Sequence, residues 1–588
     1  MNTKFVLVKA YTTIIIFILF SFSFFFSCGR SYNEPSRPSK NYPAQEELPP
    51  GYKDSDYQKA SGVSEGESTR QFAREQKRQS PASPAKIKGI KSKENAQGNI
   101  ANNKDKLPTS PKDEEYNTEQ YDKINDNPFL DVKQNPLSTF SIDVDTASYA
   151  NVRRYLNGGS LPPKDAVRIE ELINYFSYNY KEPEGKTPFS VATEISTAPW
   201  KPENYLMKIA LKGVSIEKKN IPPRNLVFLL DVSGSMLTAD KLPLVKQGLK
   251  LLLGELTEKD RIALVVYAGA SGLVLPPTSA DKKEKIISAL DSLEAGGSTN
   301  GGAGIELAYK VARENFNKQG INRVILATDG DFNVGVSSQG DLIRMIEKER
   351  ESGVFLTVLG FGTGNIKDTT MEQLANKGNG NYAYIDNLME ARKVLVTQAG
   401  GTLVTIAKDV KLQLEFNPKF VKSYRLIGYE NRLLRNEDFN DDKKDAGEIG
   451  SGHYVTALYE LTPTKNKSTT PVVDPLKYQE DRKNSKASDS DEILTIKFRY
   501  KEPDGSKSSL LTFPIQYNIL DIGQTSSDYR FAASVAAFGM LLRDSEHKGN
   551  ANWKDTYDLA KKSLGTDKEG YRAEFLTLVD KAKSISKK

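Results

Sequence analysis

The feature that most constrains the fold is an alternation of short apolar runs with amphipathic helical patterns between residues 201 and 400. Strands that are apolar throughout are buried on both faces, so helices must cover both sides of a parallel sheet. Between the runs, apolar residues recur at helical spacing, for example from Leu242 to Leu256. The pattern predicts a doubly wound, mostly parallel α/β domain over residues 201–400. The strand-like runs are Leu226–Leu230, Ile262–Val266, Val324–Leu326 and Val354–Leu359.

The regions on either side of this domain have different periodicities. Residues 116–200 contain one strand-like run and two helical patterns, which predicts a small α+β region. After residue 401, apolar and polar residues alternate strictly, which is typical of antiparallel strands with one solvated face. We therefore expect residues 401–588 to form an antiparallel sheet followed by helices. The predicted helices are Phe531–Leu542, Trp553–Leu564 and Tyr571–Ile585.

The N-terminus carries the pattern of an export signal. Lys4 and Lys9 precede the apolar run Ile14–Phe26, which is shorter than a helix that spans a bilayer. The run ends at Ser27-Cys28, which resembles a bacterial lipoprotein signal. That resemblance implies that residues 1–27 are removed and that Cys28 carries a lipid. An uncleaved anchor that begins at Ala10 is the alternative. Both interpretations predict an exported protein held at the membrane of the cell envelope, on its periplasmic or outer-surface side.

Residues 28–115 contain few aliphatic side chains and many polar residues and prolines. Such a segment buries too little apolar surface to offset the entropy cost of ordering it. We therefore predict a disordered tether that holds the folded regions on the order of 50 Å from the lipid.

Composition excludes several classes of function. The chain has 588 residues, with 82 Lys and Arg against 76 Asp and Glu, so no basic excess indicates a nucleic-acid partner. Cys28 is the single cysteine, and His453 and His547 are the two histidines. A zinc site built from Cys and His, a Cys–His nucleophile pair and a disulfide framework therefore lack the residues that they need.

Oxygen-bearing side chains follow the first strand of the predicted α/β domain. Asp231, Ser233 and Ser235 lie in one short turn directly after that strand. Ligands bind in open parallel sheets beyond the carboxyl ends of the strands, where this turn is expected. Carboxylate and hydroxyl oxygens suit a hard divalent cation: Mg²⁺, or alternatively Ca²⁺ or Mn²⁺.

One turn cannot fill the coordination shell of such an ion, so donors from other strand ends are needed. The glycine-rich loop Gly296–Gly302 offers Thr299 or Ser298, and the sequence Thr328-Asp329-Gly330 offers Asp329 after a later strand. Both follow the first turn in an order that places them at the same edge of the sheet.

These three motifs together resemble the von Willebrand factor type A domain over roughly residues 201–400. The resemblance implies a metal-ion-dependent adhesion site in which the serines bind the ion directly and the carboxylates often act through water. It also implies an open coordination position that accepts an acidic group from a protein partner. Carried over residue by residue, the ligands are Asp231, Ser233, Ser235, Thr299 and Asp329.

The flanks resemble the accessory regions of a group of exported bacterial lipoproteins. The resemblance rests on Ser138–Tyr149 and on Tyr529-Arg530-Phe531. Members of this group are often labelled as distant relatives of the calcium-activated chloride channel family. We do not expect a channel, because the sequence has no second apolar span that could form a pore.

Three other motif matches fail at specific positions. Residues 329–333 begin like an EF-hand loop, but Gly340 stands where the terminal Glu belongs. The loop Gly296–Gly302 lacks the Gly-Lys-Ser/Thr ending of a P-loop. Asp143 and Asp145 resemble the nucleophile pair of haloacid-dehalogenase phosphatases, but Ala147 replaces the threonine of that family.

We therefore expect a non-enzymatic, metal-dependent protein-binding module of the adhesion type, anchored by a lipid and bound by a partner that presents Asp or Glu. The alternative is a structural scaffold of the envelope in which the metal only stabilises the fold. An enzyme is not expected, because no nucleophile–base pair accompanies the predicted metal site.

Overall fold

The computed structural model describes residues 117–269, 271–297, 301–330, 339–399, 403–466 and 490–587. The predicted signal peptide, Cys28, the tether 28–115 and Thr299 lie outside these residues, as does most of the polar segment between residues 466 and 490. Within the described part of the chain, no helix combines the length and the apolar character needed to cross a bilayer.

The predicted α/β domain contains a six-stranded sheet with the strand order β10-β9-β8-β5-β6-β7. All neighbouring pairs are parallel except β6 and β7, which are antiparallel. This confirms the predicted doubly wound, mostly parallel fold. The strands are β5 (Arg224–Asp231), β6 (Arg261–Tyr267), β7 (Ser271–Ser279), β8 (Ile321–Thr328), β9 (Phe355–Phe361) and β10 (Tyr382–Ile385).

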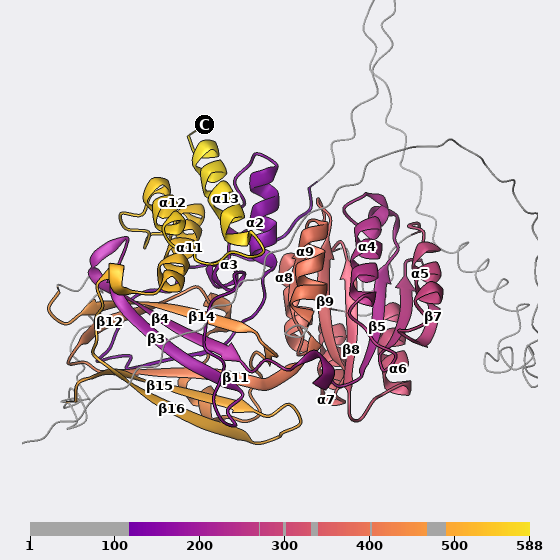
Figure 1. Ribbon diagram of the computed structural model, residues 1–588, viewed down its shortest axis with the longest axis horizontal. Coiled ribbons are helices and arrows are strands. Elements are labelled where there is room, and N and C mark those ends of the chain that lie inside the picture. Colours follow the sequence, from indigo (N-terminus) through magenta and orange to yellow (C-terminus); the bar gives the residue numbers. More distant parts are fainter. Residues whose placement is uncertain are drawn as a thin grey trace, which may run out of the picture. The chain divides into compact units, whose positions relative to one another are not determined.

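Both faces of this sheet are buried, which explains why its strands are apolar without alternation. Leu226, Phe228 and Leu230 of β5 belong to the hydrophobic core on one face, and Val227 and Leu229 belong to the core on the other. Figure 1 shows the helices on either side of the sheet. Those of the first face are α4 (Leu242–Leu253), α5 (Lys283–Asp291) and α9 (Leu388–Arg392). Those of the second are α6 (Gly301–Glu314), α7 (Gln339–Glu351) and α8 (Asp368–Lys377).

The rest of the described chain contains two antiparallel sheets that share a core. One has the order β1-β12-β14-β4-β3, and the other has the order β13-β11-β15-β16 with β2 also paired to β11. Leu211 and Tyr459 of the first sheet and Leu412 and Phe498 of the second lie in the core between them. The strands of the first sheet are β1 (Leu130–Asp131), β3 (Phe189–Ala198), β4 (Lys201–Gly213), β12 (Val421–Ile427) and β14 (Tyr454–Pro463). Those of the second are β2 (Leu137–Ser141), β11 (Thr405–Phe416), β13 (Ile449–Gly450), β15 (Glu492–Lys501) and β16 (Ser508–Gln516).

Strand β4 corrects the predicted start of the α/β domain at residue 201. Its residues pair with β14, in a register that runs from Tyr205 opposite Leu461 to Lys212 opposite Tyr454. The partner strand lies about 250 residues later in the sequence, and local periodicity carries no information about so distant a pairing. The α/β domain therefore begins with β5, and residues 201–213 belong to the antiparallel part.

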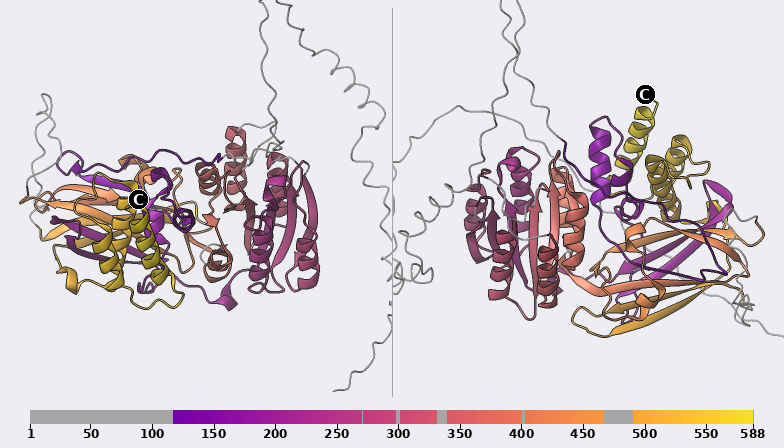
Figure 2. Two further views of the ribbon diagram at one scale, coloured as in Figure 1. Left: turned by 90° about the horizontal axis from the view of Figure 1, so that it is seen from above. Right: turned by 180° about the vertical axis from the view of Figure 1, so that it is seen from behind.

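Helices from both ends of the described chain cover the outer face of the sheet that contains β4 (Figures 1 and 2). Leu206 and Leu458 on this sheet, and Trp200 in the turn between β3 and β4, share one core with these helices. The regions predicted as separate N-terminal and C-terminal parts therefore interleave into one accessory body. Its helices are α2 (Ala147–Asn157), α3 (Ile169–Asn174), α11 (Ser527–Arg543), α12 (Trp553–Lys561) and α13 (Tyr571–Ile585).

Candidate metal site

The Asp231–Ser235 turn lies at the carboxyl end of β5, where the sequence predicts it. Asp231 is fully buried, and its Oδ1 accepts a hydrogen bond from the backbone N of Ser233 at 2.9 Å. This local bond closes the turn and brings the two serine hydroxyls together, with Oγ atoms 3.0 Å apart. Ser233 is buried, whereas Ser235 is exposed. The turn therefore presents adjacent hydroxyl oxygens, one of them at the surface, beside a buried carboxylate.

The end of β8 places further oxygen-bearing side chains beside this turn. Thr328 donates from Oγ1 to Asp231 Oδ2 at 3.2 Å, and Tyr267 donates to the same oxygen from its hydroxyl at 3.1 Å. Asp329 follows Thr328 and is fully buried. Hydrogen bonds from Asn365 and Ser235 reach its carboxylate. The structure thus brings Asp231, Ser233, Ser235 and Asp329 together at one edge of the sheet.

The two carboxylates differ in their electrostatic surroundings. Burial, and to a smaller extent the charge of Asp329, raise the pKa of Asp231, although hydrogen bonds from Ser233 act against this. Burial also acts to raise the pKa of Asp329, but hydrogen bonds from Asn365 and Ser235 and the charge of Lys241 outweigh it, so its pKa is lowered. Two buried carboxylates with adjacent hydroxyls form a donor set that fits a hard divalent cation.

The beginning of the glycine-rich loop is joined to the Asp231–Ser235 turn by two backbone hydrogen bonds. Gly296 N donates to Val232 O at 2.7 Å, and Gly234 N donates to Gly297 O at 3.1 Å. Thr299, the fifth predicted ligand, lies outside the described residues, as does Ser298. The described part of the loop therefore contacts the turn, while the role of Thr299 stays a prediction.

Sequence reasoning missed two side chains beside Asp329, namely Lys241 and Asn365. Lys241 donates from Nζ to Asp329 Oδ2 at 3.0 Å and to Asn365 Oδ1 at 3.2 Å. Asn365 lies in the loop after β9, which approaches Gly330 closely. Gly330 has a φ of +108°, and a Cβ there would lie 2.7 Å from Asn365 O. Neither side chain belongs to a motif, so only the three-dimensional structure reveals them.

A second group of carboxylates, Asp143, Asp145 and Glu372, lies buried in the described part of the chain, with ligand atoms within 4.8 Å of one another. Arg432 Nη2 lies 3.1, 3.2 and 3.1 Å from oxygens of Asp143, Asp145 and Glu372, respectively. One guanidinium therefore contacts all three carboxylates, and these contacts join the accessory body to helix α8. The acidic pair that resembles a phosphatase motif thus takes part in a buried ionic contact.

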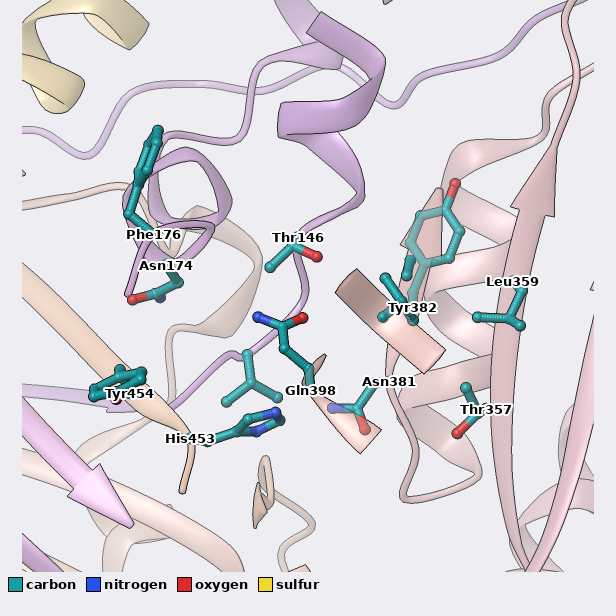
Figure 3. A pocket seen from close by; sticks show the side chains of 13 residues that line it. Thr146, Asn174, Phe176, Thr357, Leu359, Asn381, Tyr382, Gln398, His453 and Tyr454 are labelled. Carbon is teal, nitrogen blue, oxygen red and sulfur yellow. The ribbon is translucent and has the colours of Figure 1, made fainter. Parts of the chain in front are cut away.

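A small cavity of about 40 Å³ lies where the accessory body meets the α/β domain (Figure 3). His453 contributes from the accessory body, and Asn381 and Gln398 contribute from the α/β domain. Pockets for small molecules usually measure roughly 300–1,000 Å³, so this cavity fits water but not a substrate. The contact between the two bodies is therefore a packed interface at this point.

Comparison with known protein families places the α/β domain within nearly the same bounds as the structure does. The model of the von Willebrand factor type A domain matches residues 225–398, which begin within β5. A further von Willebrand factor model matches residues 115–208. The model described as "Uncharacterized protein YfbK, C-terminal" matches residues 401–585.

The uncharacterized protein YfbK of Escherichia coli K12 is 48% identical over 476 residues, which cover 80% of this chain and 82% of YfbK. This chain belongs to the YfbK family. Human inter-alpha-trypsin inhibitor heavy chain H4 is 27% identical over 166 residues, or 27% of this chain and 18% of that protein. Mouse calcium-activated chloride channel regulator 1 is 29% identical over 169 residues, or 28% of this chain and 17% of that protein.

The shorter similarities confirm the expected resemblance to von Willebrand factor type A proteins. In that family the domain mediates metal-dependent protein interactions. The matched stretch covers less than a fifth of the heavy chain and of the channel regulator, so it extends to a domain and not to the whole of either protein.

Proposed function

We propose that the chain is a non-enzymatic protein-binding module that depends on a divalent cation and is displayed on the cell envelope through a lipid on Cys28. The observation that carries the proposal is the convergence of the Ser233 and Ser235 hydroxyls, 3.0 Å apart, next to the buried carboxylates of Asp231 and Asp329. The residues that would hold the ion are these four together with Thr299.

The chemistry of the donor set supports binding better than catalysis. A divalent cation held partly by neutral hydroxyls keeps attraction for a further anionic ligand. Ser235 is exposed, so an Asp or Glu side chain of a partner protein has access to this edge of the sheet. The loops around the site would supply the remaining affinity and the specificity, because one local bond supplies little of either.

The direct test is capture of a partner from native envelopes by the full chain in Mg²⁺ and in excess EDTA. We expect a partner that is retained in Mg²⁺ and lost in EDTA. Asp231→Ala should abolish capture while the circular dichroism spectrum stays unchanged, and Asp281→Ala, an exposed change in the same domain, should leave it intact. Undiminished capture in EDTA would contradict the proposal.

The alternative, a structural scaffold of the envelope, predicts a different result for the same full chain. If the ion only stabilises the fold, Mg²⁺ should raise the melting temperature of the wild-type chain substantially, yet no partner should depend on the metal. The ionic contacts of Arg432 between the accessory body and α8 favour a rigid assembly and give this alternative its support.

The anchoring part of the proposal has its own test. Labelling of growing cells with a fatty-acid analogue should modify the wild-type chain, and Cys28→Ala should remove both the label and the membrane association. Label on the Cys28→Ala variant, or its absence from the wild type, would contradict lipidation of Cys28.

A further inference from the structure

Lys241 places a positive charge inside the candidate metal site. Its Nζ lies 3.0 Å from Asp329 Oδ2 and forms an ion pair in which the two side chains are 8% and 0% exposed. Nζ also donates to Asn365 Oδ1 at 3.2 Å. The side chain therefore points inward, toward a carboxylate that the ion would use, and not into solvent.

The backbone is shaped to hold this lysine in position. Gly362 has a φ of +73°, and a Cβ there would lie 2.2–2.7 Å from the Cε, Cγ and Cδ atoms of Lys241. Only a glycine leaves room for the lysine stem at this contact. Lys241 directly precedes α4, and its backbone N bonds to Thr238 O at 3.0 Å. The ammonium is thus a fixed component of the site.

This charge changes the electrostatics of metal binding. Asp231 and Asp329 together carry −2, and Lys241 reduces the sum for these three side chains to −1. A divalent cation added to Asp231 and Asp329 alone would give a neutral site, whereas with Lys241 the loaded site carries +1. The unloaded site therefore attracts the ion less strongly with Lys241 than without it, and the loaded site attracts an anion.

We propose that Lys241 weakens the affinity of the site for divalent ions and couples ion binding to the arrival of a carboxylate from the partner. In the absence of an anion the ion binds weakly, because a fixed ammonium competes for Asp329. In its presence the anion neutralises the excess charge, so the ion and the carboxylate stabilise each other's binding. The coupling rests on the proposed function, whereas the weakening of ion affinity concerns the isolated chain.

The test is a titration of the full chain with Mn²⁺. Calorimetry and electron paramagnetic resonance of the free ion measure how much Mn²⁺ is bound. Lys241→Met keeps the stem that packs on Gly362 and removes the charge. We expect it to bind Mn²⁺ at least about tenfold more tightly, which is a conservative figure for a unit charge a few ångströms away in a partly shielded site. Lys241→Gln, which can still donate to Asp329, should shift affinity in the same direction.

Lys208→Met is the matched control. Lys208 lies in β4, where its Nζ is 2.6 Å from Glu194 Oε1 and its side chain is 3% exposed. This change removes a buried, paired lysine of the accessory body, so it should leave Mn²⁺ affinity at the wild-type value. Melting curves of all variants establish that they are folded.

Acetate serves as the probe for the partner's carboxylate. Saturating acetate should raise the Mn²⁺ affinity of the wild type several-fold and that of Lys241→Met by a smaller factor. Equal or weaker Mn²⁺ binding by both folded Lys241 variants, or no Mn²⁺ binding by any form, would overturn the inference. Failure of the proposed function has a different signature, because capture from envelopes would then be independent of EDTA although the Lys241 variants still bind Mn²⁺ more tightly.

Discussion

Arg154 donates from both of its terminal nitrogens to Glu119, with each nitrogen 2.9 Å from a different carboxylate oxygen. The same carboxylate accepts from the hydroxyl of Tyr155 at 2.6 Å and from Gly364 N at 2.9 Å. Gly364 directly precedes Asn365, which bonds to Lys241 in the candidate site. Glu119 therefore joins the first described segment and helix α2 to the loop that borders the metal site.

Glu119→Gln should destabilise the chain in a pH-dependent way. Burial alone would raise the pKa of Glu119, but hydrogen bonds from Arg154 and Tyr155 lower it from 4.5 to about 2. The stabilising contribution is therefore complete above about pH 4.5 and is lost as the pH falls toward 2. Urea unfolding of the two chains should show a difference in stability at pH 7 that shrinks between pH 4.5 and 3. Glu437→Gln, at an exposed site, is the control, and a constant difference would contradict the assignment.

Glu460→Gln should be strongly destabilising. Glu460 is 2.9 Å from Arg425 Nη2, and their side chains are 1% and 2% exposed. Glu460 also accepts from Trp200 Nε1 at 3.0 Å and from Asn204 Nδ2 at 2.7 Å. Removal of its charge leaves a buried guanidinium without its ion-pair partner, which costs roughly 3–5 kcal/mol.

The control for Glu460 is an exposed pair on the other sheet. Glu415 lies 3.2 Å from Lys497, with side-chain exposures of 55% and 31%. Glu415→Gln should change the free energy of unfolding by about 1 kcal/mol or less, because solvent screens such pairs. If chemical denaturation shows the same loss of stability for Glu460→Gln and Glu415→Gln, burial is not the cause of the effect.

Gly304→Ala tests the close packing of α6 on β6 next to the metal site. A Cβ at residue 304 would lie 2.8 Å from the Cβ of Tyr267, whose hydroxyl bonds to Asp231. The overpacking, about 1–3 kcal/mol, exceeds the gain in helix propensity of about 1 kcal/mol, so we expect a lower melting temperature. Mn²⁺ affinity should fall as well, because Tyr267 would move. Gly272→Ala, where a Cβ meets nothing within 4 Å, should leave both quantities nearly unchanged.

His453 should make stability rise with pH between about 4 and 6.5. Burial and the charges of Lys212 and Arg323 lower the pKa of His453 from 6.5 to about 4. As the pH falls below 6.5, the unfolded chain binds a proton that the folded chain takes up only near pH 4. The free energy of unfolding therefore falls by up to about 3 kcal/mol as the pH drops through this interval. His453→Asn should remove this pH dependence, so the difference in unfolding free energy between the two chains should change between pH 4 and 6.5. Parallel profiles would exclude His453 as the cause.

Sequence periodicity predicts the elements of this chain well where burial leaves a local pattern. The apolar runs at Leu226–Leu230 and Ile262–Val266 lie within β5 and β6, and Tyr571–Ile585 coincides with α13. No local sequence pattern predicts the pairing of β4 with β14, because these strands are far apart in the sequence and meet only in the folded chain. The convergence of the Asp231 turn and Asp329 follows from the rule that parallel strands end at one edge.

Lys241 is the part of the site that no pattern predicts. It lies 88 residues before Asp329 and outside every motif. Its inward direction depends on the space beside Gly362, which belongs to a third segment of the chain. This contact requires three segments that are distant in the sequence, so only the three-dimensional structure shows it.

The pairing of β4 with β14 also determines where the chain can be cut. Because one strand precedes the α/β domain and the other follows it, the domain is inserted into the accessory body. The chain enters it from β4 of one antiparallel sheet and leaves it into β11 of the other. A fragment that ends near residue 400 would keep β3 beside β4 but remove β14, and the exposed edge of an apolar strand favours aggregation. A soluble α/β fragment should therefore start after residue 213. An accessory body in which a short linker joins β4 to β11 should fold without the α/β domain.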